Sequence, residues 1–137
     1  MIAPDTSVVI AALTTWHAAH GVAREAVGSV ADRRLIAHVA FETTSSLSRM
    51  PRGMRVSATV VRSALEEMFP AEWLQLDPVG ARRTFATVVA GGVSGGALYD
   101  AAIAATAAQA GRRLVTLDRR ALPVYELVGA DVELLSA

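Results

Sequence analysis

The sequence predicts an α/β fold in which a mostly parallel sheet is flanked by helices. Short apolar segments suited to strands alternate along the chain with longer segments that have helical periodicity. Alternation of this kind is typical of parallel sheets, because each parallel pair needs a crossover that is usually a helix. The length of 137 residues suits one domain, and we expect residues 1–137 to form it.

Five short apolar segments are predicted to be strands. They are residues 2–4, 34–37, 73–76, 114–117 and 132–135. We expect Pro4 to end the first strand early, because proline lacks the N–H group that a central strand needs. The prediction is therefore a central sheet of about five short strands.

Seven segments have the periodicity or the flanking signals of helices. They are residues 7–13, 17–30, 39–49, 56–69, 79–90, 97–110 and 120–127. Thr6 or Ser7 is a suitable N-cap for the first helix, and Pro51 with Gly53 stops the third. The sixth ends at Gly111 and is rich in alanine, which implies close packing on both of its sides.

The composition excludes several classes of protein. The absence of cysteine rules out a disulfide scaffold, a thiolate zinc site and a catalytic cysteine. All 13 basic residues are arginine, so mechanisms that need a lysine are also excluded. A formal net charge of zero provides no general attraction to nucleic acid. Without a signal peptide or a long apolar stretch, we expect a cytoplasmic domain with no membrane contact.

Four acidic residues have unusual surroundings. Asp5 and Asp118 directly follow predicted strands, Glu42 lies within an apolar run, and Asp100 opens a helix with no other charge between residues 97 and 110. Ligands of open α/β sheets bind beyond the carboxyl ends of the strands, so we expect these acids to converge there.

A hard divalent cation is the simplest partner for four converging carboxylates. Carboxylates a few ångströms apart otherwise raise one another's pKa, and ligand sets made only of oxygen suit Mg²⁺ or Mn²⁺. Such an ion can support a phosphoryl displacement. Each acid taken alone also has a structural interpretation, as a helix cap, a first-turn acid or a turn residue. The four together favour a site.

Four segments in this order resemble the PIN-domain ribonucleases, and in particular the VapC toxins of prokaryotic toxin–antitoxin pairs. The resemblance covers the whole chain, and the segments are residues 5–7, 42–51, 95–107 and 114–118. It implies a PIN-like fold with metal-binding acids at Asp5, Glu42, Asp100 and Asp118. It also implies hydroxyl support from Thr6 or Ser7 and from Thr116.

The resemblance further implies that the protein is a toxin that cleaves an RNA phosphodiester, is inhibited by an antitoxin protein and forms a homodimer. We expect Asp5, Asp100 and Asp118 to hold Mg²⁺ or Mn²⁺, and Glu42 to complete the shell or to orient the attacking water. A structured RNA such as tRNA or rRNA is the expected substrate, since a neutral protein is better suited to recognising shape. The resemblance also allows for a groove near Trp16 that would bind a helix of the antitoxin.

Several arginines along the chain could bind the phosphate groups of an RNA. Arg49, Arg52 and Arg119 are the candidates for RNA contact, because guanidinium groups bind phosphate in a bidentate manner. The alternative for the whole chain is a catalytically inactive PIN-like module that binds or regulates a partner. Metal dependence distinguishes the two hypotheses.

Two further motifs have less support. Residues 92–96 match the G-x-S-x-G nucleophile elbow, but all three histidines precede Ser94, so a flexible loop leading to Asp100 is the preferred interpretation. The three histidines are His17, His20 and His38. They could form a zinc site in principle, but solvated or capping roles are favoured.

Overall fold

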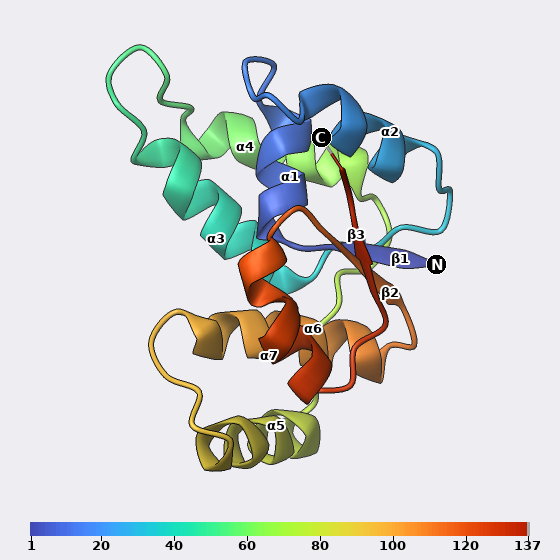
Figure 1. Ribbon diagram of the computed structural model, residues 1–137. Helices are drawn as coiled ribbons and strands as arrows, with labels where there is room; N and C mark the ends of the chain where they lie inside the picture. Colours follow the sequence, from blue (N-terminus) through green and yellow to red (C-terminus); the bar gives the residue numbers. More distant parts are fainter. Residues whose placement is uncertain (137) are drawn as a thin grey trace.

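Three parallel strands form the centre of the computed structural model, which describes residues 1–136 (Figure 1). β1 (Ile2–Pro4) pairs with β2 (Arg113–Thr116), and β2 pairs with β3 (Val132–Leu134), so the strand order is β1-β2-β3. Ala3 lies opposite Leu114 in this register, and both are fully buried. Burial on both faces explains why β1 and most of β2 are apolar rather than alternating.

The sheet is smaller than the sequence predicts. The expected strands at residues 34–37 and 73–76 are joined only by an isolated bridge between Ile36 and Leu74. The N–H of Ala37 donates to the Leu74 carbonyl at 2.8 Å, and Ala37 is also the first residue of the next helix. The helix therefore begins before a strand can form, and the described residues contain three strands instead of five.

Helices occur in all seven expected segments. They are α1 (Thr6–Leu13), α2 (His20–Gly28), α3 (Ala37–Ser48), α4 (Ala58–Met68), α5 (Pro78–Ala90), α6 (Ala97–Gln109) and α7 (Leu122–Leu127), with the short 3₁₀ helix η1 (Arg119–Ala121) before α7. The N-cap of α1 is Asp5, not Thr6 or Ser7 as expected, and Ser57 and Asp77 cap α4 and α5 in the same way. No helix within residues 1–136 is long and apolar enough to cross a bilayer.

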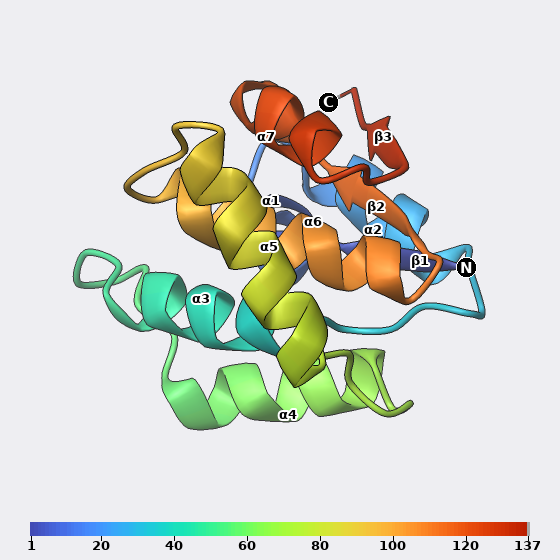
Figure 2. The ribbon, with the colours of Figure 1, turned by 90° about the horizontal axis from the view of Figure 1, so that it is seen from below.

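The helices form two groups, one on each side of the sheet (Figure 1). α1 packs against β1 and β2 on one side, together with α2, α3 and α4. α6 packs against β2 on the other side, and Figure 2 shows α5 lying across it. Small side chains such as Ala101, Ala104 and Ala107 are fully buried along α6, and they allow this close approach. The beginning of α6 is thereby held near the carboxyl ends of β1 and β2.

Candidate active site

Asp5 is the most enclosed of the four predicted acids. It follows β1 directly and is only 2% exposed. One carboxylate oxygen, Oδ1, accepts hydrogen bonds from the Ser7 hydroxyl at 2.5 Å and from the Val8 N–H at 3.2 Å. The other, Oδ2, accepts from the hydroxyls of Thr116 and Tyr125, the latter at 2.7 Å. These four donors occupy the lone-pair positions of the carboxylate and fix its orientation.

Burial dominates the electrostatics of Asp5. It raises the pKa of the carboxyl above its ordinary value, although all four hydrogen bonds oppose the rise. Within residues 1–136, none of the ion pairs joins an arginine to Asp5. A charged Asp5 is therefore costly in this position, and a nearby cation would lower that cost.

Asp100 connects the four acids electrostatically. It lies in the first turn of α6 and is partly buried. Burial raises the pKa of its carboxyl to about 6, and the charges of Glu42, Asp118 and Asp5 contribute to that rise in this order. The fold therefore brings together four acids that are up to 113 positions apart in the sequence.

Glu42 and its neighbours link α3 to α1 and α6. The Glu42 atom Oε1 accepts a hydrogen bond from the Thr6 hydroxyl at 2.7 Å. Its Oε2 lies 3.8 Å from Nε2 of His38, one turn earlier on α3. The His38 ring stacks on Tyr99 of α6, with 5.2 Å between the ring centroids and 15° between the planes. Thr6 thus fixes one carboxylate oxygen of Glu42, while the other faces His38 without a hydrogen bond.

The two supporting hydroxyls each connect Asp5 to the segment after β2. Ser7 donates to Asp5 and accepts from the Leu117 N–H at 3.0 Å. Thr116 donates to Asp5 and accepts from the Asp118 N–H at 2.9 Å. Asp118 then caps η1, where its Oδ1 accepts from the Arg120 N–H at 3.0 Å. Asp5 and Asp118 are therefore positioned by one continuous hydrogen-bond network.

The chemistry of the donors fits a hard divalent cation, since every candidate ligand is a carboxylate oxygen. No group of three metal-binding side chains is yet arranged to hold an ion in the part of the chain that the structure describes. Both oxygens of Asp5 are engaged by hydroxyl or N–H donors. Asp5 would therefore give up one hydroxyl hydrogen bond when it binds a metal ion.

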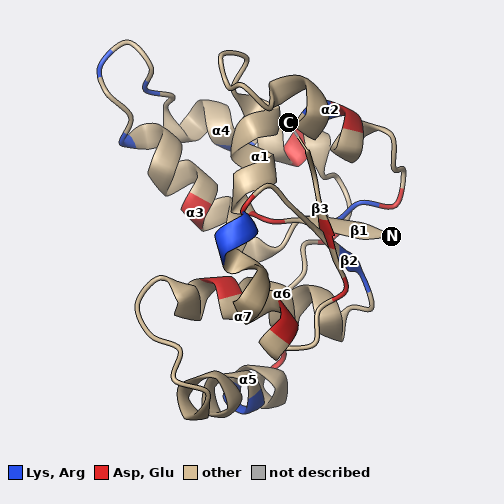
Figure 3. Cartoon of the chain, viewed as in Figure 1, with Lys and Arg blue, Asp and Glu red and all other residues tan. Residues whose placement is uncertain are grey.

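The proposed RNA-binding arginines do not lie together. Arg119 opens η1 and is adjacent to Asp118. Arg49 and Arg52 follow the last turn of α3, and Nε of Arg49 donates to the Ser45 carbonyl at 3.0 Å. Figure 3 shows the basic positions of the α3–α4 loop away from the acidic ones on α3, on α6 and just before α1, whereas η1 lies beside them in this view. Of these three candidates, Arg119 alone is adjacent to one of the acids, and its neighbour Arg120 pairs with Asp118 at 3.7 Å.

Sequence reasoning missed Tyr125. It is 1% exposed, and its hydroxyl donates to an acid 120 positions earlier, so no local pattern could reveal the pairing. Burial and the nearby Asp5 raise the pKa of Tyr125, which keeps its hydroxyl protonated as a donor.

The histidines do not form a zinc site. The ring of His17 accepts from the Ala19 N–H at 3.0 Å, and Nδ1 of His20 lies 2.9 Å from the Ala11 carbonyl.

Residues 91–96 form the predicted loop, in which Gly92 and Gly95 have positive φ angles of 82° and 62°. Glycine permits these angles without strain.

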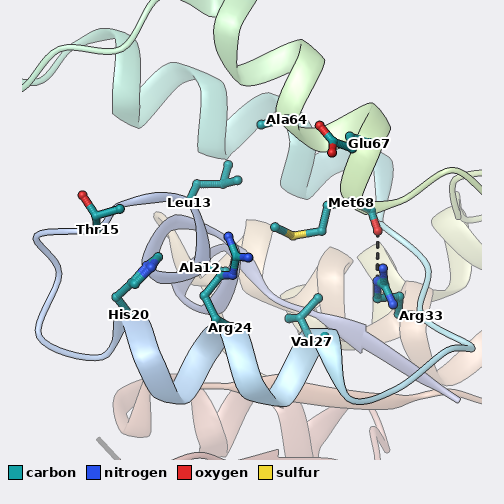
Figure 4. A pocket seen from close by; sticks show the side chains of 11 residues that line it. Ala12, Leu13, Thr15, His20, Arg24, Val27, Arg33, Ala64, Glu67 and Met68 are labelled. Atoms are coloured by element: carbon teal, nitrogen blue, oxygen red, sulfur yellow. Dashed lines mark hydrogen bonds between the residues drawn. The ribbon is translucent and has the colours of Figure 1, made fainter.

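A cavity of about 410 Å³ lies away from the four acids, between α1, α2 and α4. Figure 4 shows the side chains of Leu13, Arg24, Val27 and Met68 around it, and Nε of Arg33 donates to the Met68 carbonyl at 2.9 Å. Its wall thus combines apolar side chains with charged ones.

Comparisons with known proteins agree with this geometry. Residues 2–127 match the family described as PIN domain. Ribonuclease VapC40 of Mycobacterium tuberculosis (strain ATCC 25618 / H37Rv) is 40% identical over 136 residues, which cover 99% of this chain and 100% of that protein. Ribonuclease VapC27 of the same strain is 35% identical over 131 residues, covering 96% of this chain and 94% of that protein.

A solved structure has the same fold. The crystal structure of Mycobacterium tuberculosis VapC20, described as a Sarcin-Ricin loop cleaving toxin, superimposes with a TM-score of 0.71. The superposition covers 95% of this chain and 96% of VapC20, at 20% sequence identity. At that identity the likeness concerns the fold alone.

Proposed function

The chain belongs to the PIN-domain family, and on that premise we propose that it is the ribonuclease toxin of a toxin–antitoxin pair, hydrolysing RNA with Mg²⁺ or Mn²⁺. The expected RNA is a structured one such as tRNA or rRNA. The observation that supports this most directly is the raised pKa of Asp100, which burial causes first and the charges of Glu42, Asp118 and Asp5 raise further because these acids lie close by. Four acids held this close are suited to a divalent cation.

Asp5, Asp100 and Asp118 are the proposed metal ligands. The ion would supply a water of lowered pKa and would stabilise the oxygens of the phosphodiester displacement. Ser7, Thr116 and Tyr125 fix the Asp5 carboxylate through their hydroxyls. One of these hydroxyls would turn away when Asp5 binds the ion.

Glu42 and Arg119 have separate roles in the proposal. The hydrogen bond from Thr6 leaves Oε2 of Glu42 available to orient the attacking water. Arg119 is placed beside Asp118 and can pair with a phosphate of the RNA. Arg49 and Arg52 lie farther from the acids, so we assign them to more distant parts of a folded RNA.

An antitoxin protein and a second copy of the chain are the proposed partners. The cavity between α1, α2 and α4 offers an apolar floor beside charged groups such as Arg24 and Glu67, which suits an antitoxin segment. α5 exposes the apolar side chains of Val79, Phe85 and Val89, at 66%, 64% and 50%. A homodimer would cover this apolar surface.

The test is to incubate the wild-type protein and Asp5→Asn with total cellular RNA. Each is assayed with Mg²⁺, with Mn²⁺ and with EDTA, and Asp131→Asn serves as the matched control, because its carboxylate is exposed and pairs only with Arg113 at the surface. We expect discrete fragments that require both metal and Asp5. Cleavage that persists in EDTA or in Asp5→Asn would refute the mechanism. A folded wild-type protein that neither binds metal nor cleaves RNA would favour the inactive module.

A further inference from the structure

An aromatic residue immediately precedes an acidic one on both helices that face the site. Phe41 precedes Glu42 on α3, and Tyr99 precedes Asp100 on α6. Consecutive residues on a helix point about 100° apart, so each ring flanks the acid that follows it. The two rings therefore border the acidic site from opposite helices.

Both rings are unusually exposed. Phe41 is 75% exposed and Tyr99 is 56% exposed, although large aromatic side chains are mostly buried in folded proteins. Together with His38, Glu42 and Ser45 they line an open cavity of about 260 Å³. It is smaller than most pockets for drug-sized ligands, and its size suits a single planar group.

His38 fixes the orientation of Tyr99. The two rings stack at 5.2 Å between centroids and 15° between planes, and His38 is itself held near Glu42. One side of the tyrosine ring is therefore covered, while the residue remains more than half exposed. A ring held in place before its ligand arrives loses little conformational entropy on binding.

We propose that Phe41 and Tyr99 form a stacking subsite for one unpaired base of the RNA, next to the phosphodiester bond that is cut. This inference rests on the proposed function, because the acids beside the rings are the ones assigned to the metal and the phosphate. Proteins that recognise single-stranded RNA stack splayed bases on aromatic side chains and hydrogen-bond their edges. Glu42 and Ser45 provide polar groups along the cavity wall for such an edge.

The subsite is tested directly by NMR of the wild-type protein with Ca²⁺ in place of Mg²⁺. The probes are AMP and UMP, and ribose 5-phosphate is the matched compound without a base. The chain contains three Phe and two Tyr, so selectively labelled rings give few signals to assign. We expect both nucleotides to shift the Phe41 and Tyr99 ring signals upfield and in a saturable manner. Phe69 and Phe85 should not respond, because Phe69 is buried and Phe85 lies on α5.

Variants measure the contribution of each ring. Phe41→Ala and Tyr99→Leu should each weaken nucleotide binding by about five-fold to about a hundred-fold, as expected for the loss of one base–aromatic stack. Tyr99→Phe keeps the ring and should bind as the wild type does. Trp16→Ala is the control. It removes an exposed ring that follows the C-terminal end of α1, whereas Asp5 lies at the N-terminal end, so this variant should bind nucleotide as the wild type does.

Three outcomes would overturn the subsite. These are the absence of shifts with either nucleotide, equal shifts with ribose 5-phosphate, and unchanged nucleotide affinity in Phe41→Ala together with altered sedimentation. The last would identify the rings as a contact with a second copy of the chain. Cleavage of total RNA with Mg²⁺, measured in parallel, separates the two proposals. Metal-dependent cleavage without ring shifts refutes the subsite alone, and ring shifts without cleavage refute the nuclease while supporting nucleotide binding.

Discussion

Asp100→Asn should stabilise the metal-free protein at neutral pH while abolishing RNA cleavage. Asp100 is partly buried and lies among three other carboxylates. Its burial, together with the charges of these carboxylates, raises its pKa from 3.8 to about 6. Ionising this group in the folded protein therefore costs free energy that the unfolded chain does not require. Asparagine has a similar shape and no charge, so it removes the cost.

The size of the effect follows from the shift in pKa. A rise of about two units corresponds to about 3 kcal/mol, at about 1.4 kcal/mol per unit. Asp100 is only partly buried, and solvent screening reduces this to about 1.5 kcal/mol. The substitution also loses a favourable interaction of about 0.5 kcal/mol between the charge and the N-terminus of α6. We therefore expect a gain of about 1 kcal/mol, or about 4 °C in Tm.

The pH dependence has a defined sign. The folded protein binds the Asp100 proton more tightly than the unfolded chain does, so Asp100 makes wild-type stability fall as the pH rises from about 4 to about 6. Asp100→Asn lacks this contribution. The stability difference between the two proteins should be absent at pH 4 and complete above pH 7.

Urea unfolding in EDTA at several pH values measures this difference. Glu126→Gln is the matched control, because it changes an exposed carboxylate on α7 to an amide, and its effect should stay within about 0.5 kcal/mol. A destabilised Asp100→Asn at pH 7.5, or a stability gain that does not depend on pH, would refute the electrostatic explanation.

Three further perturbations test other parts of the structure. Tyr125→Phe removes a buried hydrogen bond to Asp5 and keeps the ring, so it should raise the pKa of Asp5. It should also lower the free energy of unfolding in urea at pH 7.5 by about 1–3 kcal/mol. An unchanged unfolding midpoint would contradict this. Arg112→Ala should lower the free energy of unfolding by about 2–4 kcal/mol, because this buried side chain donates a hydrogen bond to the Ile2 carbonyl and pairs with Asp32 at 2.8 Å. A loss of stability no greater than that of Asp32→Asn would contradict this. Mg²⁺ at 100 times its Kd should add about 2.7 kcal/mol to wild-type stability at pH 7.5, and a Tm that does not respond to Mg²⁺ would argue against a metal site.

The helices and the acids could be predicted from the sequence because their signals are local. Periodicity revealed all seven helical segments, and each acid was marked as unusual by its place at a strand end, at a helix start or, for Glu42, within an apolar run. The two missing strands could not be predicted in this way. Whether residues 34–37 form a strand depends on how early α3 begins, and their apolar character does not encode that.

The hydrogen bonds around Asp5 were also beyond prediction, for a related reason. Thr116 was expected as a support because it follows a family pattern, whereas Tyr125 reaches the same carboxylate from another helix. Packing of α7 decides that contact, and a single sequence gives no measure of it. His38 and Tyr99 are a similar case, since their stacking depends on the spacing of α3 and α6.

The order of the site along the chain has a consequence for a growing polypeptide. Asp5 is synthesised near the start, but its partners Thr116 and Tyr125 follow 111 and 120 positions later. At roughly 5–20 residues per second, a ribosome needs about 6–24 s to cover the distance between Asp5 and Tyr125. A nascent chain therefore cannot assemble the acidic site until most of it has been translated. Until then, Asp5 lacks the two hydroxyl donors that fix its carboxylate.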